Sequence, residues 1–292
     1  MSYALSVLTT DLRARFRDVA GNFISAVPAT NYLNVAFENF TNDTECNWRE
    51  FGFYITGKQY VYTLPADCLH TLTAMWYQNG QYEIPFLSEQ EFKARGNMNR
   101  RISVSTPQSY TIVQDGSGAA NSLLLGPAPG TTSNTSMVNP GSISALQTSI
   151  NVSDATKFQS PAGMVLIDSE QIIYQNQDNL KPGNLLLCLR GKGGTAAAVH
   201  SSCAVVYRLD LVITYTYAYK YMAATTDTPN IPLQYQKIPI HYALALALKQ
   251  DGRDKQAMAE MEEYMALRKE AKRQVRIQTR DKNNRRISTA YS

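Results

Sequence analysis

Few side chains of this 292-residue sequence combine the type and the spacing that chemistry requires. The three histidines stand far apart, without the short spacings that metal sites commonly show: His70, His200 and His241. The four cysteines contain no CxxC pair, which argues against a zinc knuckle or a thioredoxin-like redox motif: Cys46, Cys68, Cys188 and Cys203. We therefore predict no metal site, no cofactor and no enzymatic activity. We interpret the cysteines as free thiols and His241 as a hydrogen-bonded core or interface residue.

Two other segments could suggest chemistry. The sequence RGKGGT at 190–195 invites comparison with a phosphate loop, but it lacks the GxxxxGK[ST] spacing and predicts a glycine turn. Asp168 and Glu170 could form an acid and base pair, yet nothing near them in sequence supplies a nucleophile or an orienting group. We interpret them as a solvated strand edge or turn, and residues 115–118 as another turn.

The distribution of charge is more informative than the net charge of +4. From Arg268 onward there are nine Lys or Arg and two acidic residues, a local balance of +7, so the preceding residues carry −3. This segment could bind phosphate or an acidic protein groove, or it could be a soluble helix end whose cations suit the helix dipole. We favour binding, because so many like charges repel one another unless a negative partner is present.

Composition bounds the class of protein. With 44% hydrophobic and 18% charged residues the chain is close to globular averages, and its length favours two or three compact units. No run of about 18 apolar residues is present, and Asp11 and Arg13 come too early for a secretory signal. We therefore expect synthesis in the cytoplasm and no membrane partner.

Helical periodicity marks both ends of the sequence. Apolar residues recur at steps of three and four over 5–23 and again over 32–40, after a start signal at Pro28 and Thr30. Near the other end, 240–249 is an Ala- and Leu-rich helix, residues 251–252 break it, and 258–275 carry a further stripe. Each end is thus predicted to form a helical hairpin.

Between them lie short segments rich in aromatic and β-branched residues. Segments 51–55 and 60–64, with a turn at 56–58, predict a β-hairpin. Ser88 and Glu91 form a capping box for a brief helix at 88–94. The alternation from Leu211 to Tyr221 is typical of a strand with one aromatic face. Other strands are predicted at 71–77, 109–113, 122–125, 150–152, 164–167, 171–174, 185–189 and 204–207.

These elements predict an α+β fold. N- and C-terminal helical hairpins form a helical bundle, and an antiparallel β-domain carries an inserted small all-β domain. The predicted boundaries are 1–48 and 230–278 for the bundle, 49–129 and 208–222 for the β-domain, 130–144 for a polar linker, 145–207 for the inserted domain and 279–292 for a flexible basic C-terminal tail.

The order of several small motifs resembles the head-to-tail adaptor, or connector, family of tailed bacteriophages. The motifs are YLNVA at 32–36, TG at 56–57, YTLPAD at 62–67, PQSY at 107–110, LLGP at 124–127, the strand at 215–221, IP at 231–232 and HYALA at 241–245. Residues 152–200 are similar to a small β-module that recurs in phage tail and connector proteins, in which Glu170, Arg190 and His200 would stabilise the fold or make surface contacts.

This resemblance implies a structural virion protein at the head-tail junction. Its helical bundles would form a homo-oligomeric ring, expected to contain twelve copies, that joins the portal protein to the tail tube, nozzle or terminator and lets genomic DNA pass. The C-terminal segment would dock on the portal through Lys272, Arg273, Arg276, Arg280, Lys282, Arg285, Arg286, Ile287 and Tyr291.

Two alternatives remain open at the level of sequence. The inserted module also suits another tail protein, such as a hub or fibre-attachment protein. The basic C-terminal helix also suits a DNA-contacting arm, for which non-specific contact with DNA would show a steep salt dependence.

Overall fold

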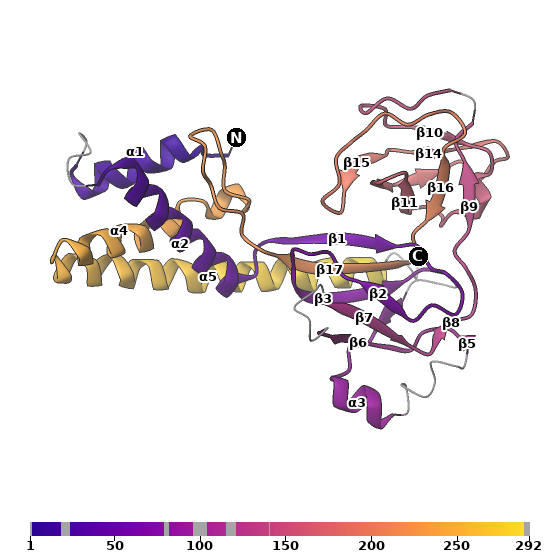
Figure 1. The fold of residues 1–292 in the computed structure, drawn as a ribbon, viewed down its shortest axis with the longest axis horizontal. Helices are drawn as coiled ribbons and strands as arrows, with labels where there is room; N and C mark the ends of the chain where they lie inside the picture. The colour runs from indigo at the N-terminus through magenta and orange to yellow at the C-terminus, as the bar shows by residue number, and fades with distance from the viewer. Residues whose placement is uncertain are drawn as a thin grey trace. The chain divides into compact units, whose positions relative to one another are not determined.

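The computed structural model describes residues 2–18, 24–78, 82–95, 104–114, 121–139 and 141–288, with the side chains of the last helix described as far as Ile277. Within these ranges the protein is mixed α+β, with five α-helices and four antiparallel sheets (Figure 1). The chain forms two compact units. We call Met1–Trp48 with Thr216–Ser292 the helical unit, and Arg49–Tyr215 the β unit.

The helical unit contains four α-helices and one short 3-10 helix. They are α1 (Leu5–Phe16), α2 (Ala26–Thr44), η3 (Leu233–Tyr235), α4 (Ile238–Gln250) and α5 (Asp254–Ser288). Figure 1 shows α4 lying along the much longer α5, with α2 running obliquely to it.

The sequence periodicity explains the core of the helical unit. The buried residues of α1 are Leu5, Leu8, Leu12 and Phe16, which follow one another at steps of three and four and so form one stripe. The buried positions in the described part of α5 follow one another at steps of seven, seven and four and so also lie on one face: Ala257, Tyr264, Ala271 and Val275. These stripes join buried residues of α2 and α4 in a single hydrophobic core.

In its described residues the β unit contains short strands, one six-residue α-helix and one short 3-10 helix. Its elements are β1 (Trp48–Phe53), β2 (Val61–Thr63), β3 (Cys68–Trp76), β4 (Tyr82–Ile84), α3 (Glu89–Ala94), β5 (Val104–Ser105), β6 (Ser109–Val113), β7 (Ser122–Gly126), β8 (Ala128–Pro129), β9 (Thr135–Met137), β10 (Ile150–Val152), η2 (Ala155–Lys157), β11 (Gly163–Ile167), β12 (Glu170–Tyr174), β13 (Asn176–Gln177), β14 (Gly183–Leu186), β15 (Leu189–Lys192), β16 (Val205–Arg208) and β17 (Leu211–Tyr217). The capping box predicted for α3 is confirmed, since the side chains of Ser88 and Glu91 each bond to the other's backbone N–H.

Strand order groups the β unit into distinct sheets. The four antiparallel sheets have the orders β1-β17-β3-β4, β2-β7-β6, β15-β12-β11-β16-β9 and β10-β14-β13, and β5 pairs with β8 in parallel. The last two antiparallel sheets enclose a core of their own, which includes Val152, Phe158, Ile172 and Tyr174. Its boundary strands β9 and β16 are antiparallel neighbours, with Thr135 opposite Tyr207.

Three predictions made from local pattern are wrong in part. Segments 51–55 and 60–64 do not form a hairpin, because β1 and β2 belong to different sheets. The segment 130–144 is not simply a linker, because Thr135–Met137 forms β9, and Val138 and Ile143 are buried in the core beside it. Residues 185–189 do not form one strand but contribute to both β14 and β15.

Two predicted ends also differ. The alternation of Leu211 to Tyr221 outlasts its strand: β17 ends at Tyr217, and Tyr219 instead stacks on Phe37 of α2 at 5.8 Å between ring centroids. The predicted flexible tail from residue 279 is helical in backbone as far as Ser288, while residues 289–292 lie outside the described residues. Val19 and Phe23, predicted in the first helix, and the turn at 115–118 also lie outside them.

A close contact joins β1 to β12 within the β unit. The side-chain amide of Gln171 donates to the carbonyl oxygen of Gly52 at 2.9 Å and accepts from its N–H at 3.0 Å. Gly52 has no room for a side chain, since an added Cβ would lie 2.6 Å from Leu209 Cδ1 and 2.7 Å from Met164 Sδ. The absence of a side chain at Gly52 thus permits this contact.

The substitution Gly52→Ala is expected to lower the free energy of unfolding of the β unit by about 1–3 kcal/mol, because the added methyl group overpacks this contact. Urea denaturation measures the loss. The control is Gly57→Ala, whose Cβ would lie 3.3 Å from the movable Thr132 Oγ1 and which we expect to change stability by about 0.5 kcal/mol at most. Equal effects of the two substitutions would contradict the tight packing at Gly52.

Candidate functional site

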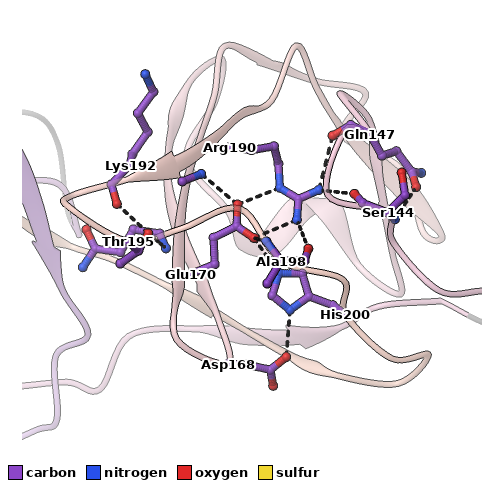
Figure 2. Close-up of polar contacts among 11 residues, drawn as sticks. Ser144, Gln147, Asp168, Glu170, Arg190, Lys192, Thr195, Ala198 and His200 are labelled. Carbon is purple, nitrogen blue, oxygen red and sulfur yellow. Dashed lines mark hydrogen bonds and ion pairs between the residues drawn. The ribbon is translucent and has the colours of Figure 1, made fainter. Parts of the chain in front are cut away.

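A buried carboxylate organises one end of the β unit. Glu170 is the first residue of β12, directly after the turn that joins it to β11, and its side chain is fully buried. Figure 2 shows the groups that converge on it. Its Oε1 accepts from Arg190 Nε and from the N–H of Gly191, both at 2.8 Å. Its Oε2 lies 2.7 Å from Arg190 Nη2, 2.9 Å from the N–H of Ala198 and 2.8 Å from His200 Nε2.

Arg190 and His200 extend this cluster to the surrounding loops. The guanidinium donates to the carbonyl oxygens of Ser144 at 2.6 Å and Ala198 at 2.7 Å, in addition to its two bonds to Glu170 (Figure 2). The second ring nitrogen of His200, Nδ1, lies 2.7 Å from Asp168 Oδ2. We call Glu170, Arg190 and His200 the carboxylate hub.

The carboxylate hub holds its loops through buried polar contacts. Both nitrogens of His200 and both oxygens of Glu170 have protein partners, and the two side chains are 1% and 0% exposed, so their polar atoms are satisfied inside the protein. The interpretation of Glu170 as a solvated residue is wrong, whereas Asp168 is 63% exposed and lies in the turn with a φ of 52°.

The glycine turn predicted at 190–195 is confirmed. Gly191, Gly193 and Gly194 have φ values of 60°, 64° and 83°, a region that L side chains rarely adopt. The N–H of Gly191 bonds to Glu170, so this turn presents backbone to a carboxylate inside the protein.

The basic face of α5 is the second candidate site. Arg268 Nε and Lys272 Nζ lie 3.3 and 3.4 Å from the two carboxylate oxygens of Asp43 on α2. Arg273 forms two hydrogen bonds with Glu270, at 2.9 and 2.7 Å. The bonds from Arg273, and then from Gln274, lower the pKa of the exposed Glu270 to about 2.

The nine residues predicted to bind a portal differ in whether they have a partner within the chain and in whether the structure describes them. Lys272 is partly committed to Asp43 and Arg273 to Glu270, while Arg276 is exposed. A cavity of about 510 Å³ lies against the basic face of α5. Its lining residues, as far as the structure describes them, are Ala266, Lys269, Glu270, Lys272, Arg273, Arg276 and Ile277. The backbone of α5 also carries four further cations and one apolar residue whose side chains lie outside the described part: Arg280, Lys282, Arg285, Arg286 and Ile287. Tyr291 lies outside the described residues altogether.

The helical unit brings together a group that the sequence did not reveal. His241 Nδ1 on α4 lies 2.8 Å from Glu260 Oε2 and 3.7 Å from Glu263 Oε2, both on α5. These residues could offer a metal ion three ligand atoms. However, Arg15 Nη1 lies 3.2 Å from His241 Nε2. Since arginine only donates, Nε2 must accept and Nδ1 then donates to Glu260, which makes His241 a hydrogen-bonded link between α1, α4 and α5.

The remaining sequence predictions concern the cysteines and membranes. All four cysteines are free. In the part of the chain that the structure describes, none of the helices combines the length and the apolar character needed to cross a bilayer.

Comparison with known proteins gives no assignment: no protein-family model matches the chain, and no curated protein matches it in sequence.

The substitution Glu170→Gln is expected to lower the free energy of unfolding of the β unit by about 3–5 kcal/mol, because it leaves Arg190 buried without its counter-ion. Chemical denaturation followed by tryptophan fluorescence measures the loss. Asp168→Asn is the matched control, since Asp168 is largely exposed and Asn tolerates its left-handed backbone, and we expect it to cost about 1 kcal/mol or less. A loss at Asp168 as large as that at Glu170 would refute the central role of the hub carboxylate.

The hub also predicts a pH dependence. Burial raises the pKa of Glu170, but Arg190, the N–H groups of Ala198 and Gly191, and His200 outweigh it and lower the pKa from 4.5 to about 2. A lowered pKa means that the stabilisation is complete above about pH 4.5 and is lost as the pH falls towards 2.

The difference in unfolding free energy between the wild type and Glu170→Gln should therefore shrink as the pH falls from 5 to 2. Denaturation curves across this range measure it, with Asp168→Asn as the control that keeps the Glu170 contribution. A difference that stays constant with pH would show that Glu170 is not ionised in the folded protein.

Proposed function

We propose that this chain is a structural subunit of a tailed-bacteriophage virion, a head-to-tail adaptor. Its copies form a ring, expected to contain twelve, that joins the portal to the tail and lets genomic DNA pass through its centre. The observation that carries the proposal is the length and charge of α5.

The helix α5 is much longer than its partner α4. It has 35 residues, which corresponds to about 50 Å, whereas its partner α4 has 13. Among the α5 residues whose side chains the structure describes, the last buried one is Val275, and the backbone remains helical to Ser288. The sequence from 276 to 288 contains only two large apolar residues, Ile277 and Ile287, which is too few for an apolar stripe. A helical segment of about a dozen residues without such a stripe is marginally stable by itself in water. A partner surface would stabilise it.

The charge of this extension indicates the kind of partner. Beyond Val275 the helix contains five cations and only one acidic residue: Arg276, Arg280, Lys282, Arg285, Arg286 and Asp281. Cations at the end of a helix are favourable for its dipole, but only within about the last turn, and these cover three turns. An acidic groove on another protein fits this length and charge, and we assign it to the portal.

The β unit suits a structural role. The polar atoms at the centre of the hub are used to hold three loops, and the Gln171 amide joins β12 to β1. In our proposal residues 1–48 and 230–278 form the bundle that makes the ring. The β-domain at 49–129 and 208–222, with its inserted domain at 145–207, faces the tail tube, nozzle or terminator. Twelve C-terminal segments together would give high avidity from weak single contacts.

Deletion of residues 279–292 is expected to leave a folded, self-assembling protein that binds the portal of its own phage at least about 100-fold more weakly, because each copy loses its docking segment. Electron microscopy of the protein alone and mixed with portal shows ring order and stacking, and circular dichroism checks the helices. The matched control is Lys93→Gln, which removes an exposed cation of α3 in the β unit and should leave portal binding unchanged.

Three results would count against the proposal. Undiminished portal binding by the deletion variant would remove the docking role of the C-terminal segment. Particles without rotational symmetry would favour the hub or fibre-attachment alternative. If instead the full chain binds duplex DNA with a steep salt dependence that neutralising Arg273, Arg276 and Arg280 reduces, the basic helix is a DNA-contacting arm.

A further inference from the structure

We propose that α5 is also a contact between copies of this chain, in which the acidic first part of its exposed face packs against the basic second part of α5 from a second copy. The inference rests on the self-assembly proposed above, and it names the surface responsible.

The helix α5 is divided by charge along its length. Residues 254–263 contain four acidic residues and one lysine, a balance of −3. Residues 264–277 contain five Lys or Arg and one acidic residue, a balance of +4. The two parts of this helix are therefore complementary to each other, and a second copy of the chain supplies both.

The helix dipole does not account for this division. Its effect on charged side chains is confined to the first and last turns of a helix. Glu262 and Glu263 lie in the third turn of α5, and Lys269 and Arg276 lie in its interior, well before the last turn of its 35 residues. Their placement is thus not explained by the stability of the isolated helix.

Apolar side chains lie among these charges. Met258 and Met265 are 65% and 48% exposed. Together with Glu262 and Lys269 they follow one another at steps of four, three and four, so the four residues share one face of the helix. The core-facing residues Ala257 and Tyr264 belong to a different stripe. Methionine adapts to irregular surfaces and is enriched in protein interfaces, so this face has the composition of a contact surface.

Contacts within the chain leave part of the charge on this face available. Arg268 and Lys272 are paired with Asp43. In the described part of the chain, by contrast, Glu262, Lys269 and Arg276 are exposed and have no ion-pair partner. These charges can be satisfied by a neighbouring molecule without breaking the fold.

The arrangement favours a closed ring. The acidic and basic parts are different surfaces of one chain, displaced along α5 by seven residues or about 10 Å between Glu262 and Lys269. A contact between unlike surfaces of identical copies is heterologous, and heterologous contacts close into rings when the rotation permits.

Charge reversal in the full-length chain tests the contact. One variant carries Glu262→Lys with Glu263→Lys, and another carries Lys269→Glu with Arg276→Glu. In each variant alone, the two parts of α5 that meet between copies carry charge of the same sign. We therefore expect its self-association to weaken at least about 100-fold. An equimolar mixture, or one chain carrying all four substitutions, restores opposite charges at every contact and should reassemble. Native mass spectrometry and sedimentation velocity give the masses.

Two further variants serve as controls. Glu262→Lys alone leaves Glu263 beside His241 and should weaken assembly less, in the same direction. Glu83→Lys with Glu89→Lys adds the same charge at exposed positions of the β unit and should leave assembly unchanged. Reassembly of the mixture also demonstrates that both charge-reversed chains are folded.

The outcomes separate this inference from the proposed function. The α5 contact is overturned if both charge-reversal variants still form rings, or if the two variants do not assemble when they are mixed. Either result leaves the adaptor proposal unaffected. A wild type that remains monomeric overturns both. A charge-dependent particle of only two copies supports the α5 contact and overturns the ring.

Discussion

The buried ion pair between Glu170 and Arg190 is the interaction on which the arrangement of the loops around β12 and β15 depends. A fully buried carboxylate is costly unless its oxygens are satisfied, and Glu170 has five polar contacts to neighbouring groups. Those donors come from β15, where the glycine turn begins, and from residues 198–200, so meeting the needs of one carboxylate fixes two segments at once. In the described part of the chain, the hydrophobic core beside the ion pair has thirteen buried residues. The polar contacts of Glu170 therefore define the positions of those loops more than this small core does.

Local features of the sequence were sufficient to identify most elements. The stripes of α1 and α2, the capping box of α3 and strands such as β6 and β7 follow from the periodicity and end signals of a few neighbouring residues. Which β-strands pair with one another could not be predicted from such local features. The turn at 56–58 suggested that β1 pairs with β2, but β1 instead neighbours β17, about 160 residues later. Which strands meet depends on burial across the whole unit, and β9 lay hidden in a polar segment because only three residues pair.

The candidate sites show the same division. The excess of cations after Arg268 was visible as composition, but the commitment of Arg268 and Lys272 to Asp43 depends on how α2 lies against α5. Glu170 appeared solvated because its partners, Arg190 and His200, are 20 and 30 residues away. His241 was likewise isolated in sequence, and it meets Glu260 only because α4 and α5 pack together. Residue types indicated where charge lies, and only the fold indicated which charges are already neutralised.

The pairing of β9 with β16 has a consequence for how such a chain could have arisen. Since Thr135 lies opposite Tyr207, the stretch of chain from β9 to β16 begins and ends at adjacent strands. A segment whose two ends lie side by side can be gained, lost or exchanged by recombination with only a short splice in the host chain. The two hydrogen bonds between Gln171 and Gly52 would then be a later adaptation. They would have fixed the transferred segment to the strand β1 of the host chain.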